Sequence, residues 1–209
     1  MSKVIVMSSE DKIANELVKE YGTKNPKIIF ITTGANLDTG DKQWLKDAQN
    51  AMKDAGFELI EYDLEDNKCC EDFIIDFRDA DGIHLVGGCP EHLLMWIKRS
   101  ELDKFLQKNP FHQIISGASA GAVVLTRSIQ NITHWEQECL KLENYEGVGL
   151  VPFEILPHIG QERVIENQIR CFRASCNSFQ NGVYLNDHSY IVYDNSTFTI
   201  VEVSNKHNF

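Results

Sequence analysis

The chain has 209 residues, of which 43% are hydrophobic and 24% charged, and its formal net charge is −11. This composition is typical of a folded globular protein, and the length favours a single domain over residues 1–209. The acidic excess argues against nucleic acid and anionic membranes as partners. The start lacks the apolar core of a signal peptide, and no segment approaches the roughly 20 apolar residues of a membrane span, so we expect a cytoplasmic protein.

Short apolar runs alternate with segments of helical periodicity over the first part of the chain. The apolar runs predict buried strands at residues 3–7, 27–33, 57–64, 82–88 and 112–117. The segments between them predict helices, at residues 10–22, 41–56, 71–81 and, opened by Pro90, 90–107. Such alternation with short connections predicts an α/β fold with a parallel sheet covered by helices on both faces.

The last third of the chain follows a different pattern. Residues 183–203 read as strands that are broken at 186–188 and again by a turn at 194–197, which predicts an antiparallel extension of the sheet. In an open α/β sheet, ligands bind beyond the carboxyl ends of the strands. Two glycine-rich strand ends, at residues 87–88 and 117–121, are therefore expected on the side of the sheet that carries a site.

A G-x-S-x-G pattern surrounds Ser119, between a β-branched run and an apolar segment. In this motif the serine stands on a sharp turn from strand to helix, called the elbow, with its hydroxyl exposed. Small residues two positions before and after the serine avoid a steric clash within the turn. The helix that follows directs unpaired N–H groups toward the reacting oxygen. The pattern predicts a catalytic serine; the alternative is a strand-helix turn whose glycines serve only close packing.

A serine nucleophile needs a base, and the chain has seven histidines. We favour His158, because Pro157 before it stiffens the backbone and presents the imidazole from an extended segment. Four others have plainer readings as structural or remote residues: His84 inside a strand, His112 before one, His134 near the serine in sequence, and His207 in the tail.

Three segments together resemble the serine peptidase family of aspartyl dipeptidase (dipeptidase E) and cyanophycinase, peptidase S51. They are "LVGGCPEHLL" at 85–94, "GASAGAVVL" at 117–125 and "GLVPFEILPH" at 149–158. The resemblance implies a flavodoxin-like, doubly wound fold related to class I glutamine amidotransferases. It also implies a catalytic triad, a small peptide substrate, and neither a metal nor another cofactor.

The same resemblance assigns roles to individual positions. The family's nucleophile corresponds to Ser119 and its base to His158. Its oxyanion hole corresponds to the backbone N–H groups of Gly88 and Ala120, which would face the charge that develops in acyl transfer.

The sequence departs from the family pattern at two places. Relatives usually carry Asn-Thr where Cys89-Pro90 stands here, which leaves the backbone of the predicted oxyanion hole in place but alters the pocket wall. The family acid is a glutamate near the C-terminal strands, where this chain offers the shorter Asp187. Glu136, in the loop after the predicted elbow helix, is the competing acid, and we favour Asp187.

The leading hypothesis is a serine hydrolase that cleaves an amide bond in a small peptide through an acyl-enzyme. Family members favour aspartate next to the cut, and recognition of its carboxylate would need a cation. Arg163 and Arg170, on a predicted helix after His158, are the candidates; both would otherwise be surface charges.

Two other hypotheses belong to different classes. A catalytically silent binding or regulatory module would keep the elbow but lack turnover, in line with the altered Cys89-Pro90 and the shorter acid. An amidotransferase-type domain that serves a synthase partner is less favoured, because such domains use a cysteine where Ser119 stands. The sequence leaves open whether the chain is a monomer or a homodimer.

Overall fold

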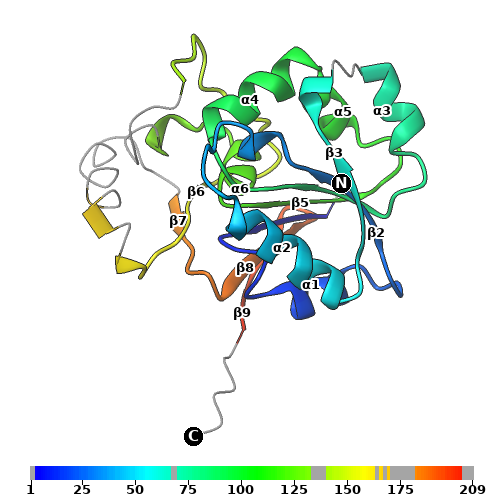
Figure 1. Ribbon diagram of the computed structural model, residues 1–209, viewed down its shortest axis with the longest axis horizontal. Helices are drawn as coiled ribbons and strands as arrows, with labels where there is room; N and C mark the ends of the chain where they lie inside the picture. Colours follow the sequence, from blue (N-terminus) through cyan, green and yellow to red (C-terminus); the bar gives the residue numbers. More distant parts are fainter. Residues whose placement is uncertain are drawn as a thin grey trace, which may run out of the picture.

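Seven strands form the central sheet of the computed structural model, which describes residues 3–66, 70–132, 140–162, 165–166, 169 and 182–203 (Figure 1). The strand order is β3-β2-β4-β5-β1-β8-β9. The strands of this sheet are β1 (Val4–Met7), β2 (Lys27–Ile31), β3 (Glu58–Tyr62), β4 (Gly82–Leu85), β5 (Ile114–Ala118), β8 (Ser189–Asp194) and β9 (Thr197–Glu202). A separate two-stranded sheet pairs β6 (Glu154–Leu156) with β7 (Gly182–Tyr184).

The five N-terminal strands are parallel to one another, whereas β8 runs antiparallel to β1 and to β9. The turn between β8 and β9 holds Asn195 and Ser196 at φ of 47° and 65°. Two successive positive φ values are what a tight two-residue hairpin requires. The predicted α/β fold, with a mostly parallel sheet and an antiparallel extension, is confirmed, although β7 pairs in parallel with β6 rather than joining the extension.

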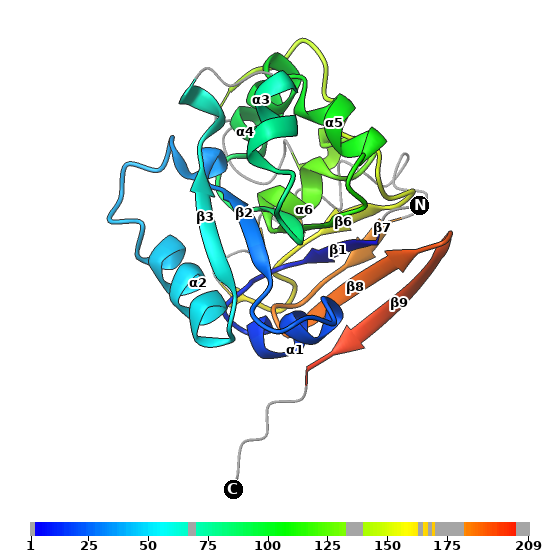
Figure 2. The same cartoon turned by 90° about the vertical axis from the view of Figure 1, so that its right-hand side faces the viewer.

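Helices cover both faces of the main sheet (Figure 2). Two of them lie on one face: α1 (Ala14–Glu20) and α2 (Gln43–Asp54). Four lie on the other: α3 (Cys70–Asp76), α4 (Pro90–Arg99), α5 (Leu102–Lys108) and α6 (Ala120–Val124). Single turns of 3₁₀-helix are η1 (Thr33–Ala35), η2 (Leu64–Asp66) and η3 (Gln130–Ile132). Within the described ranges, none of the helices has the length and apolar character needed to cross a bilayer.

Each helical layer closes its own apolar core against the sheet. On the α3–α6 face, Phe73, Phe77 and Phe105 pack ring against ring, with centroids 5.2–5.9 Å apart. On the α1–α2 face, Leu17 and Met52 are fully buried against the sheet. Strands covered on both faces explain why their sequences are continuous apolar runs rather than alternating ones.

The predicted helical segment at 90–107 is divided in the structure. Helix α4 ends where the hydroxyl of Ser100 donates a hydrogen bond of 2.7 Å to the carbonyl of Trp96. Glu101 then adopts a left-handed conformation with φ of 60°, and α5 begins after it. A side-chain bond to the carbonyl four residues back bends a helix, and a left-handed residue ends it.

Candidate active site

Ser119 occupies the sharp turn between β5 and α6 at the carboxyl edge of the sheet. Its backbone has φ of 49° and ψ of −116°, a region that residues with side chains rarely adopt. The N–H of Ser119 donates to the carbonyl of Met7, at the end of the neighbouring strand β1, over 3.0 Å. The strained serine is therefore held by the strand beside it.

The two glycines of the elbow are required by close backbone contacts. A Cβ placed on Gly117 would lie 2.4 Å from the carbonyl oxygen of Gly121, and one placed on Gly121 would lie 1.9 Å from that of Leu85. No side chain fits at such distances, so the spacing of small residues around Ser119 is a steric requirement of the turn.

His158 follows β6 directly, after Pro157, and faces the serine. Its Nε2 lies 2.9 Å from the Oγ of Ser119. The strand before it is extended, as predicted, but His158 itself is left-handed, with φ of 62°. A residue with a side chain adopts this conformation only when its surroundings enforce it.

Asp187 completes the arrangement on the far side of the imidazole. Its Oδ1 lies 2.7 Å from Nδ1 of His158, and its Oδ2 accepts a hydrogen bond from the side-chain amide of Gln161. The side chains of His158 and Asp187 are only 16% and 12% exposed. Because an ionised carboxylate only accepts hydrogen bonds, Nδ1 carries the proton and Nε2 is left to accept the hydroxyl proton of Ser119.

The small sheet of β6 and β7 explains how His158 and Asp187 meet. Strands β6 and β7 pair in parallel with Leu156 opposite Tyr184, and the N–H of Leu185 donates to the carbonyl of Leu156 over 3.0 Å. Both chains therefore leave this sheet in the same direction, side by side. His158 lies two residues beyond Leu156, and Asp187 lies three beyond Tyr184.

The segment that follows β4 borders Ser119 on the other side. A Cβ placed on Gly87 would lie 3.3 Å from the Cβ of Ser119, so a side chain there would crowd Ser119 and glycine lets the two segments approach without displacement. Gly88 has φ of 114°, and a Cβ there would lie 2.1 Å from the carbonyl oxygen of Gly34 in η1. This geometry brings the backbone of Gly87-Gly88, which includes one predicted oxyanion donor, against the elbow that carries the other, Ala120.

Cys89-Pro90, where the sequence departs from the family pattern, begins helix α4. Cys89 is the N-cap, and its Sγ accepts a hydrogen bond from the backbone N–H of His92 over 3.4 Å. Pro90 stands in the first turn, where its missing N–H costs nothing. The Cys89 side chain is buried, so this residue serves to start the helix behind the glycines.

A polar cluster supports η1, the turn that contacts Gly88. The side-chain amide of Asn36 donates to Asp63 and Glu65, and the hydroxyl of Thr33 donates to Asp63, all within 2.6–2.8 Å. Burial would raise the pKa of Asp63, but the hydrogen bonds from Asn36, the Glu65 N–H and Thr33 outweigh it and lower the pKa. His92 of α4 joins the cluster through Glu65, at 2.7 Å. The ionised Asp63 therefore fixes the turn that backs the glycine pair.

The indole of Trp44 lies beside Ser119. A Cβ placed on Gly87 would lie 3.6 Å from Cζ3 of Trp44 and 3.3 Å from the Cβ of Ser119. The ring and Ser119 therefore border the same space. The indole N–H donates to Oδ2 of Asp38 over 2.7 Å, which fixes the orientation of the ring. Trp44 remains 37% exposed, so part of its ring is accessible to a molecule bound beside Ser119.

We expect Trp44→Ala to weaken substrate binding more than it slows the chemical steps. An aromatic contact of about 1.4 kcal/mol corresponds to a tenfold change in affinity, so KM for substrate should rise by about tenfold while kcat changes little. Trp44→Phe, which keeps an aromatic face, is the matched control and should stay close to wild type. Steady-state kinetics decide the point; an unchanged KM in Trp44→Ala would show that substrate does not contact the ring.

The structure brings Ser119, His158 and Asp187 together, whereas three other predicted site residues lie outside the described residues: Glu136, Arg163 and Arg170. Across the described parts of the chain, no group of three or more His, Cys, Asp or Glu side chains is arranged to hold a metal ion.

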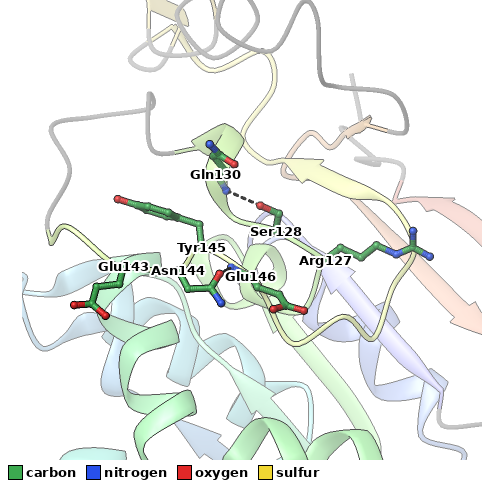
Figure 3. Close-up of a pocket in the computed structure, with 7 residues that line it drawn as sticks. All are labelled: Arg127, Ser128, Gln130, Glu143, Asn144, Tyr145 and Glu146. Carbon is green, nitrogen blue, oxygen red and sulfur yellow. Dashed lines mark hydrogen bonds between the residues drawn. The ribbon is translucent and has the colours of Figure 1, made fainter.

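An open polar hollow of about 460 Å³ lies beyond the end of α6 (Figure 3). In it, the backbone N–H of Gln130 donates to the hydroxyl of Ser128 over 3.1 Å. The side chains that line it are Arg127, Ser128, Gln130, Glu143, Asn144, Tyr145 and Glu146. No residue of the Ser119 site is among these described lining residues, so the hollow is a separate feature.

Sequence reasoning did not find Ser8, Gln161 or Trp44. The hydroxyl of Ser8 accepts from the backbone N–H of His158, and the amide of Gln161 donates to Asp187. Trp44 borders Ser119. Each of these partners is remote in sequence, and none of the three residues stands in a chemical motif. The one available signal was position: Ser8 directly follows β1, at the carboxyl edge where sites of open α/β sheets form.

Comparisons with known proteins agree with the fold and identify the family. A sequence profile of peptidase family S51 matches residues 2–201. An uncharacterized peptidase of Listeria monocytogenes is 27% identical over 142 residues, which cover 66% of this chain and 68% of the relative.

Two crystal structures show the same fold. A Listeria monocytogenes protein described as a candidate peptidase E superposes with a TM-score of 0.84 at 22% identity, covering 98% of this chain and 100% of that one. A peptidase from an acI-B1 Actinobacterium superposes with a TM-score of 0.69 at 16% identity, covering 98% of this chain and 88% of that one.

Proposed function

We propose that this chain, which belongs to peptidase family S51, is a serine peptidase that cleaves an amide bond in a small peptide through an acyl-enzyme. The observation that carries the proposal is the continuous hydrogen-bonded path from the hydroxyl of Ser119 through His158 to Asp187, at 2.9 and 2.7 Å. A hydroxyl is a poor nucleophile, and a base that is itself oriented by a carboxylate is the usual means of activating one.

In the proposed reaction, Oγ of Ser119 attacks the carbonyl carbon of the substrate while Nε2 of His158 takes its proton. Asp187 stabilises the imidazolium through Nδ1–H. The backbone N–H groups of Gly88 and Ala120 stabilise the oxyanion of the tetrahedral intermediate. His158 then gives its proton to the leaving amine, and the acyl group of the substrate stays on Ser119 as an ester. In the second half of the reaction, His158 takes a proton from a water molecule that attacks this ester, and then returns the proton to Oγ of Ser119.

For the substrate, we propose a short peptide with aspartate next to the scissile bond, on the basis of the family resemblance. Recognition of that carboxylate needs a cation, for which Arg163 and Arg170 remain the candidates from sequence. Among the described residues, Lys12 is a cation whose Nζ lies 2.9 Å from Oδ2 of Asp11 and which feels the charge of Asp187. Its hydrogen bond to Asp11 and the charge of Asp11 raise the pKa of Lys12, and the charge of Asp187 adds to this effect.

Labelling of the intact protein with a fluorophosphonate tests the proposal without knowledge of the substrate. The reagent reacts with an activated serine, so we expect a single covalent adduct on Ser119, located by peptide mass spectrometry. A heat-unfolded sample of the same protein is the control and should not react. Folded protein that stays unlabelled would contradict the proposal and favour the catalytically silent module.

A dipeptide library with every residue at the first position tests the specificity. Cleavage concentrated on peptides that begin with aspartate would support the proposed preference. Efficient cleavage of other peptides, with aspartyl peptides left intact, would contradict the preference while retaining the serine mechanism.

A further inference from the structure

Ser8 lies directly after β1 and touches both segments that carry the base and the acid. Its hydroxyl accepts a hydrogen bond from the backbone N–H of His158 over 3.0 Å and donates one to the carbonyl of Leu185 over 2.8 Å. These partners are 150 and 177 residues away in the sequence. Ser8 is 1% exposed, so water does not compete for these bonds.

We propose that Ser8 is a positioning residue of the active site, whose hydroxyl sets the placement of His158 and Asp187 relative to Ser119. The inference rests on the proposed serine mechanism and concerns a residue outside the Ser-His-Asp path. Ser8 acts on the reaction through the two segments that it joins. Its hydroxyl is buried and bonded to both of them, so it does not contact substrate.

The bonds of Ser8 complete a junction of all three catalytic segments. Met7, the preceding residue, accepts the N–H of Ser119 over 3.0 Å, so the end of β1 also holds the elbow. The carbonyl of Leu185, besides accepting from Ser8, accepts the N–H of Ile159 over 3.0 Å. The dipeptide Met7-Ser8 therefore sets where the nucleophile, the base and the segment before the acid stand with respect to one another.

The left-handed backbone of His158 explains why such a restraint is needed. At φ of 62° this residue is under strain and would relax without fixed partners. The bond from its N–H to Ser8 is made at the strained residue itself. Without it, the imidazole would lose the alignment that its two ring contacts, with Ser119 and Asp187, require.

The loop that carries Ser8 is anchored by a buried contact between Glu10 and His84. The carboxylate of Glu10 lies 3.1 Å from Nε2 of His84, and Nδ1 of His84 lies 2.9 Å from the hydroxyl of Ser116. Glu10 and His84 are 5% and 0% exposed. Because Ser116 belongs to β5, the strand that leads to Ser119, this contact ties the Ser8 loop to the elbow strand and makes it a firm support.

Kinetics of Ser8→Ala test the inference. The substitution leaves the N–H of His158 and the carbonyl of Leu185 without this partner, and a displacement of about 1 Å in a catalytic group costs up to about a hundredfold in rate. We expect kcat, and the rate of fluorophosphonate labelling, to fall by ten- to a hundredfold while KM stays within about twofold. Ser8→Thr keeps the hydroxyl and should recover most of the rate.

Ser100→Ala is the matched control, since it also removes a buried hydroxyl bonded to a backbone carbonyl, but at the end of α4 away from the site. It should lower the melting temperature by a similar amount to Ser8→Ala and leave kcat unchanged. If Ser8→Ala does not fold, Ser8→Cys fills the same space with weaker hydrogen bonds and is expected to show the same loss of kcat.

The outcomes separate the two proposals. Wild-type protein that neither labels nor hydrolyses peptides contradicts the serine mechanism itself. Active wild type together with folded Ser8→Ala or Ser8→Cys of unchanged kcat overturns the positioning role alone. A loss of kcat in Ser100→Ala equal to that in Ser8→Ala would also overturn it, because the effect would then follow from stability.

Discussion

Replacing Ser119 with alanine should abolish peptide hydrolysis and leave the fold intact. The substitution removes the Oγ that lies 2.9 Å from Nε2 of His158, and with it the proposed nucleophile. Loss of a triad member typically lowers kcat by about 10⁴–10⁶-fold. Alanine keeps the Cβ that the elbow already accommodates, so the backbone at φ of 49° meets no new steric contact.

The measurement is kcat/KM on a cleaved dipeptide, together with circular dichroism and the melting temperature. Ser100→Ala is a suitable control, because the Ser100 hydroxyl bonds to the carbonyl of Trp96 at the end of α4, away from the site, and should not affect turnover. Folded Ser119→Ala that retained wild-type turnover, after purification free of host peptidases, would show that the reaction does not use this serine.

Asp187→Ala should be severely impaired, with turnover lower by about 10⁴-fold, whereas Glu136→Ala should be nearly normal. Asp187 holds Nδ1 of His158 at 2.7 Å, and without it the imidazole loses both its orientation and the charge that stabilises its protonated form. Glu136 is expected to be a loop charge, so its removal should change turnover by less than about twofold.

Both variants should fold normally, which circular dichroism will check, and kcat of the two can then be compared directly. Asp187→Asn sharpens the test, because it keeps the size of the side chain but lacks the charge, and it should be almost as slow as Asp187→Ala. The reverse ranking, with Glu136→Ala slow and Asp187→Ala active, would assign the acid to Glu136.

The family resemblance leads us to expect a glutamate at position 187. The side chain of Asp187 is shorter, so it must be placed closer to His158 to contact the imidazole. In this chain the shorter side chain still contacts the imidazole. The parallel register of β6 and β7 places Leu156 opposite Tyr184, so the segments that follow the two strands leave the small sheet side by side. Gln161 donates to the other carboxylate oxygen and so orients the group. The two carboxylate oxygens thus have separate partners, the base and an amide.

Local sequence patterns were sufficient for most of the fold. The apolar runs at 3–7, 27–33, 82–88 and 112–117 correspond to β1, β2, β4 and β5, because strands buried on both faces are mostly apolar. The sequence did not predict the break between α4 and α5 at Glu101. Glutamate is common within helices, so its presence gives no indication of a left-handed residue that ends one. The parallel pairing of β7 with β6 was missed for a related reason: pairing partners are chosen by contacts between distant segments.

By itself, the sequence determined the elbow, because its requirement is local: Gly117 and Gly121 must lack side chains for Ser119 to stand on so sharp a turn. It also singled out His158 by its place after Pro157. Only the tertiary structure decided that Asp187 meets this histidine and that Ser8 holds the base and acid segments together. Those contacts join residues 29 and 150 positions apart, and such distances are closed by strand register and packing, which no local pattern encodes.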